Sequence, residues 1–121
     1  MSIRRRIDPA DGRAAVRAVL TGGEGREELA AASRFLLEEL AAAHEGHTVE
    51  VRVPPFGAVQ AVEGPRHTRG TPPNVVELDA RTWIALATGG LRWEDAVGAG
   101  RVAASGSRAD LSAMLPLGWD A

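Results

Sequence analysis

The chain has 121 residues, of which 45% are hydrophobic and 25% charged, so it is long enough for one domain with a core of its own. Its formal net charge of -2 gives no reason to expect a nucleic acid partner, because phosphates require a dense basic face. Since the chain has no cysteine, disulfides, thiolate nucleophiles and cysteine metal ligands are all excluded.

The sequence also contains no candidate transmembrane segment. No apolar run approaches the roughly 20 residues that span a bilayer, and the first residues lack the apolar stretch of a secretory signal. We therefore expect a cytoplasmic protein.

Residues 1–25 are predicted to be an N-terminal extension with one short helix. We interpret the three arginines at 4–6 as a solvated, charged start rather than a binding arm. Asp8 is the expected N-cap of the helix, with Pro9 in the first helical position. Three glycines within residues 21–25 end it, because glycine opposes helix propagation.

The longest predicted helix covers residues 26–44. Leucines and alanines recur at spacings of three and four, which places them on one face, and Gly46 is a natural stop. The polar face is acidic, so anionic lipid would repel it, and packing on a sheet is the favoured interpretation.

Three strands are expected next. Residues 47–53 alternate valine with polar side chains, which is typical of a half-buried strand. Two prolines at 54–55 end this strand, and further strands are expected over residues 58–63 and 74–78. Three consecutive strands with short links predict a meander.

The C-terminal third alternates helix and strand signals. Asp79 is the expected N-cap of a helix that closes at residues 88–90, and a short helix over 93–98 follows. A brief strand at 101–105 and a final helix over 107–115 complete the order. This order predicts an α+β fold with the helices segregated to one face of the sheet.

The C-terminal half also carries landmarks that resemble the sterol carrier protein family. They include a tryptophan-bearing helix, a Thr-Gly turn, an acidic-alanine pair, a Gly-Arg-Val strand start and a short apolar terminal segment. The residues are Trp83, Thr88, Gly89, Leu91, Asp95, Ala96, Gly100, Arg101, Val102, Gly106, Leu111, Met114 and Leu115. The segment at 64–74 is closest to a compact bacterial branch, and the resemblance covers residues 26–117, which leaves 118–121 as a C-terminal tail.

The resemblance implies an antiparallel-dominated sheet of about five strands with an apolar cavity between sheet and helices. The implied function is non-catalytic binding of an apolar or amphipathic small molecule, such as a lipid, fatty acyl chain or sterol-like compound. No cofactor is expected. The alternative is a protein-interaction or enzyme-accessory module with a closed core and no ligand.

Apolar residues of the predicted strands and helices are the candidates to line the cavity, although any domain of this size needs such residues for its core. The candidates are Val51, Val53, Val59, Trp83, Leu86, Val97, Leu111, Met114 and Leu115.

A polar cluster between prolines is the candidate site for a ligand headgroup. Arg66 and Arg69 are candidates to receive a carboxylate or phosphate, with His67 hydrogen-bonded alongside. Alternatively, the arginines pair with Glu63 and Glu77 in a long turn between strands.

No catalytic or metal site is predicted. His44 and His47 lie three residues apart across a glycine, whereas a zinc helix needs histidines four apart on one face. The glycines at 98–106 lack dinucleotide spacing, and no serine lies in a nucleophile elbow. Trp119 is either a docking residue for a protein partner or a second protomer, or part of a tail folded over the core.

Overall fold

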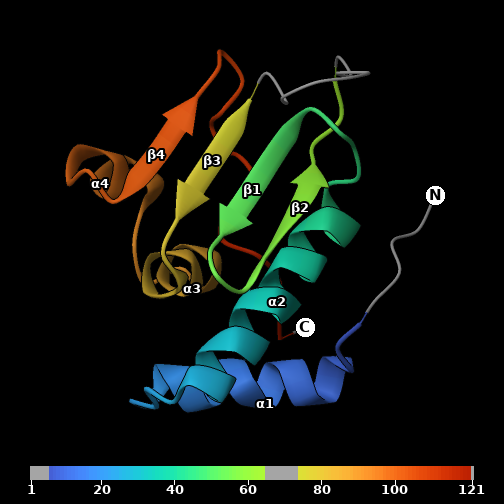
Figure 1. Cartoon of the computed structure of the whole chain (residues 1–121), viewed down its shortest axis with the longest axis vertical. Coiled ribbons are helices and arrows are strands. Elements are labelled where there is room, and N and C mark those ends of the chain that lie inside the picture. Colours follow the sequence, from blue (N-terminus) through green and yellow to red (C-terminus); the bar gives the residue numbers. More distant parts are fainter. Residues whose placement is uncertain (1–5, 65–73, 121) are drawn as a thin grey trace.

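The computed structural model describes residues 6–64 and 74–120. Within these residues the chain forms four helices and four strands (Figure 1). In chain order they are α1 (Pro9–Leu20), α2 (Arg26–Ala43), β1 (Val49–Val53), β2 (Gly57–Ala61), β3 (Val75–Leu78), α3 (Ala80–Thr88), α4 (Trp93–Gly98) and β4 (Val102–Ser105).

The strands form one mixed sheet in the order β2-β1-β3-β4. Strand β1 pairs antiparallel with β2 but parallel with β3, and β3 pairs antiparallel with β4. The predicted meander is therefore wrong, because β3 lies beside β1 rather than beside β2. The link over residues 62–74 is much longer than a hairpin turn, so it permits a crossover that the alternation within each strand does not reveal.

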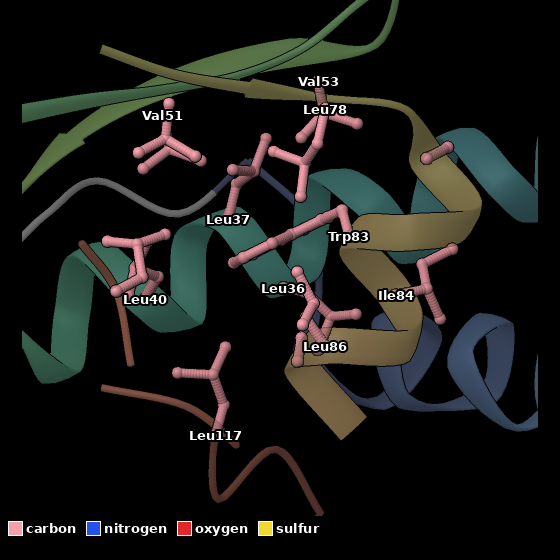
Figure 2. Close-up of a cluster of buried hydrophobic side chains, with 14 of the residues drawn as sticks. Leu36, Leu37, Leu40, Val51, Val53, Leu78, Trp83, Ile84, Leu86 and Leu117 are labelled. Atoms are coloured by element: carbon pink, nitrogen blue, oxygen red, sulfur yellow. The ribbon is translucent and has the colours of Figure 1, made fainter. Parts of the chain in front are cut away.

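The sheet and helices enclose one hydrophobic core. The valines at 49, 51 and 53 are wholly buried, which confirms the alternation predicted for this strand. Leu36 and Leu40 of α2 and Trp83 of α3 pack into the same cluster (Figure 2). The Nε1–H of Trp83 donates to the carbonyl of Ser33 across 3.2 Å, which ties α3 to α2. The predicted α+β class, with a mostly antiparallel sheet packed against helices, is confirmed.

Helix α1 packs closely against α2. Gly12 lies against Phe35, and a Cβ atom at residue 12 would come within 2.3 Å of the ring. Val16 is wholly buried in the core. Asp8 occupies the predicted N-cap position, although its carboxylate makes no capping hydrogen bond. The division of the chain at residue 25 stays a prediction.

The predicted final helix over residues 107–115 is wrong, because this segment forms turns. The carboxylate of Asp110 accepts a hydrogen bond from the N–H of Ser112 at 2.8 Å, and this bond lowers the pKa of Asp110. An aspartate that bonds its own nearby backbone competes with helix formation. Leu111 is buried, and the N–H of Leu117 donates to the carbonyl of Ala87 at 2.9 Å, so tertiary contacts hold the segment.

Asp79 caps helix α3 as predicted. Its carboxylate accepts hydrogen bonds from the N–H of Thr82 at 3.2 Å and from the Thr82 hydroxyl at 2.5 Å. Burial opposes ionisation of Asp79, but these hydrogen bonds and the charge of Arg101 outweigh it and lower the pKa below its usual value. Ionised Asp79 therefore stabilises the folded state.

We expect Asp79→Ala to lower the free energy of unfolding by about 1 kcal/mol at pH 7. A carboxylate with a depressed pKa stabilises the fold above its unfolded pKa and loses this effect as the pH falls through its folded pKa. The difference from wild type should therefore shrink below about pH 4. Denaturant unfolding at pH 7 and pH 3 measures it, with Asp79→Asn as the control that keeps a capping oxygen. An equal loss at both pH values would contradict a role for the ionised form.

Candidate binding groove

A groove of about 880 Å³ lies between helix α2 and strand β2. The helix contributes Arg34, Leu37, Glu38 and Ala41. They occupy positions i, i+3, i+4 and i+7, so they share one stripe of the helix surface. Leu37 and Ala41 are buried and form an apolar floor. The same helix thus presents one stripe to the core and an adjoining stripe to the groove.

The opposite wall is the edge of β2, which is the outermost strand on its side of the sheet (Figure 1). Five consecutive residues, 56–60, line the groove. Successive side chains of a strand point to opposite faces, so a wall of consecutive residues is a strand edge rather than one face. Arg6 and Ile7, which precede α1, and His47, which precedes β1, complete the lining.

The pairing of the sheet determines which main-chain groups of β2 point into the groove. Glu50 of β1 donates its N–H to the carbonyl of Asn74 at 3.0 Å, so the even-numbered residues of β1 direct their main chain toward β3. The odd-numbered residues then direct theirs toward β2, where they pair with the odd-numbered residues 57, 59 and 61. The main-chain groups of Ala58 and Gln60 consequently point outward, into the groove.

The outward main-chain groups at the two ends of β2 already have partners. The carbonyl of Phe56 accepts a hydrogen bond from Nε of Arg34 at 2.8 Å. The N–H of Val62 donates to the carbonyl of His44 at 2.7 Å. Within the part of the chain that the structure describes, no hydrogen bond reaches the outward groups between these two ends. The middle of β2 is therefore an open edge.

Glu38 holds the segment that precedes α1 against the groove. Its carboxylate accepts hydrogen bonds from the main-chain N–H groups of Arg6, at 2.9 Å, and Ile7, at 3.4 Å. Glu38 is only 9% exposed, and a buried carboxylate requires such donors. Ile7 packs against the edge of the hydrophobic core. The carboxylate of Glu38 is thus already hydrogen-bonded within the protein.

Two arginines and a histidine lie at the rim of the groove. Arg6 and Arg34 are both exposed to solvent. His47 lies farther along, where its Nδ1–H donates to Oε1 of Gln60 at 2.7 Å. The groove therefore combines an apolar floor with exposed positive charge.

The cavity-lining residues predicted from sequence have three different environments. Five are at most 1% exposed and belong to the packed core, and Figure 2 shows Val51, Val53, Trp83 and Leu86 within that cluster. Three are partly buried against the core, and Val97 is 45% exposed. The fully buried five are Val51, Val53, Trp83, Leu86 and Leu111, and the partly buried three are Val59, Met114 and Leu115.

Of these nine residues, Val59 is the one that lines the groove. The ligand-lining role of the others stays a prediction. Arg66, His67 and Arg69 lie outside the described residues, so their headgroup role also stays a prediction. The stripe of α2 could be found from helical spacing, but nothing local to residues 57–61 marks β2 as an edge strand.

The described residues hold neither a cluster of metal ligands nor a membrane-spanning helix. In residues 6–64 and 74–120, no three His, Cys, Asp or Glu side chains are placed to hold a metal ion. None of the helices in these ranges is both long and apolar enough to cross a membrane.

We expect Glu38→Ala to release the segment before α1, because the N–H groups of Arg6 and Ile7 lose their acceptor. The amide of Ile7 should then exchange with solvent about tenfold faster, as expected for one lost hydrogen bond to a charged group. Hydrogen exchange followed by NMR measures this rate. Glu38→Gln is the matched control, because it keeps a side-chain oxygen and should exchange at an intermediate rate. An unchanged rate in Glu38→Ala would show that the carboxylate does not hold this segment.

Comparison with known proteins identifies the family. A search of curated proteins found no match. The family model described as bacterial SCP ortholog, SCP_3, matches residues 25–117, which is more than three quarters of the chain. The match begins one residue before α2 and extends past β4 to Leu117, so it includes the groove stripe of α2 and the whole sheet. It confirms the resemblance on which the sequence interpretation relied, and the chain belongs to the bacterial SCP ortholog family.

Proposed function

We propose that the protein binds an apolar or amphipathic small molecule of lipid-like character in the groove between α2 and β2, and that it does so without catalysing a reaction. The groove itself is the observation that carries this proposal. Its volume of about 880 Å³ falls within the range of small-molecule sites, which are concave, mostly apolar and edged by a few polar groups. Membership of the SCP family also favours an apolar ligand.

Burial of apolar surface is the source of affinity in this proposal. Leu37 and Ala41 supply the floor from α2, and Phe56 and Val59 supply apolar surface from the strand side. Each Å² of apolar ligand surface removed from water contributes about 25 cal/mol. Arg34 and His47 at the rim are suited to orient a polar end of the ligand.

A second candidate function is that of an interaction module with a closed core. The packing between sheet and helices favours it, because Val51, Trp83 and Leu86 leave at most 1% of their surface exposed. In that case the protein binds another protein through its surface and carries no small molecule.

Native mass spectrometry of freshly purified protein, followed by solvent extraction, tests the proposed function. We expect a reproducible added mass that the extraction removes and identifies as a lipid-like compound. Ala41→Phe should abolish the added mass, because its ring would occupy the groove floor.

Ala43→Phe is the matched control, since Ala43 is exposed on the same helix and does not line this groove. It should retain the bound mass, and both variants should show cooperative thermal melts. A clean mass without ligand that stays unchanged after incubation with fatty acids and sterols would overturn the proposal and favour the closed-core module.

A further inference from the structure

We propose that the groove also receives the C-terminal segment of a partner protein, which adds to the free edge of β2 as an antiparallel strand with its terminal carboxylate beside Arg34. Addition of a strand to a sheet edge is a recurring mode of peptide recognition, in which main-chain hydrogen bonds supply affinity and side-chain pockets supply specificity. This inference goes beyond the small-molecule function and does not depend on it.

The open edge of β2 supplies the main-chain partners. Ala58 and Gln60 each direct one N–H and one C=O into the groove, as the pairing of β1 with β3 requires. The two residues are two apart, which is the spacing at which an antiparallel strand exchanges pairs of hydrogen bonds. An added strand therefore finds two complete hydrogen-bonded pairs between the capped ends of β2.

Helix α2 supplies the pocket for side chains. In a hydrogen-bonded antiparallel pair the two side chains lie on the same face, so the peptide residues paired with Ala58 and Gln60 point to the face that carries those side chains. The intervening residues point to the opposite face, which is the side of α2 and the core. There they meet Leu37 and Ala41, so we expect these peptide residues to be apolar.

The position of Arg34 determines the direction and the end of the added strand. Its Nε already caps the carbonyl of Phe56, so a strand that continued past this point would find that acceptor occupied. An arginine has five N–H donors, so Arg34 retains donors for a carboxylate. An antiparallel strand places its carboxyl end here, whereas a parallel strand would place its amino end beside the guanidinium.

The charges around the groove favour the same occupant. Arg6 and Arg34 are exposed, whereas the carboxylate of Glu38 is engaged by two main-chain N–H groups. On the neighbouring strand, Glu50 and Arg52 form an ion pair with each other and add no net charge. The groove is thus complementary to an anionic chain end.

The test is a titration of the full chain with the peptide acetyl-Val-Thr-Val-Thr-Val, which has a free C-terminal carboxylate and no other charge. Calorimetry measures the affinity, and NMR follows the amides of Ala58 and Gln60. We expect saturable binding that shifts both amides. A peptide amidated at its C-terminus should bind about fivefold or more weakly, as expected for a lost charge-assisted hydrogen bond.

Two N-methylated peptides separate strand addition from simple apolar binding. Methyl groups on both threonine nitrogens remove the N–H groups that point to β2, and affinity should fall about tenfold or more. Methyl groups on the third and fifth residues, both valines, remove N–H groups that point away from β2. This control peptide should bind within about twofold of the parent.

Protein variants give an independent measurement. Ala58→Pro removes an outward N–H from an edge strand, a position where proline is tolerated, and should lose binding. Ala104→Pro is the matched control, because the main chain of Ala104 points outward from β4 at the other edge of the sheet. It should bind as wild type does, and thermal melts check that both variants fold.

Two results would overturn the proposal: no shift of the Ala58 and Gln60 amides at millimolar peptide, or equal affinity for the two N-methylated peptides. Equal binding of acid and amide peptides would overturn the role assigned to Arg34. The bound mass of the purified protein is measured without peptide, so this proposal and the small-molecule function fail separately.

Discussion

The burial of helix α2 is the constraint on which the rest of the structure depends, because α1, α3 and β2 all contact this helix. Three consecutive residues make the connections. The carbonyl of Ser33 accepts from Trp83 of α3, Arg34 bonds the carbonyl of Phe56 beside β2, and Phe35 packs against Gly12 of α1. Consecutive side chains of a helix point in directions about 100° apart, so those of Arg34 and Phe35 reach different neighbours, and the carbonyl of Ser33 reaches a third. The sheet, the helices α1 and α3 and the groove are therefore positioned from a single turn of α2.

The groove follows from the same constraint. An amphipathic helix that packed on a sheet with one stripe would leave its remaining surface to solvent. Here the core stripe, with Leu36 and Leu40, adjoins a second stripe with Leu37 and Ala41, and the second stripe extends past the last strand. The sheet ends at β2, so no further strand of the described sheet extends over this stripe. The concave space exists because the helix is apolar over a wider arc than the sheet covers.

Local signals in the sequence were sufficient for most of the elements. Asp79 followed by an apolar helix and a glycine marked both ends of α3, and the alternating valines marked β1, because these features depend on neighbouring residues. Strand order was not predictable in the same way. The parallel pairing of β1 with β3 joins residues about 25 positions apart, and alternation within each strand is the same for either neighbour.

The candidate site was predictable only in part, for the same reason. The stripe of α2 could be found from its spacing, but the free edge of β2 depends on the order of the whole sheet. The C-terminal segment shows a different limit. Its sequence suits a helix start, yet Asp110 bonds Ser112, and buried Leu111 and Leu117 hold the chain in turns instead.

The contact between Gly12 and Phe35 has a consequence for the changes that this helix pair tolerates. The Phe35 ring occupies the space that a side chain at residue 12 would need. This contact therefore fixes the position of α1 along the axis of α2. The connection over residues 21–25 has no part in that contact. A change in the length of the connection should therefore leave the crossing of the two helices unchanged, whereas any residue other than glycine at position 12 must displace the phenylalanine.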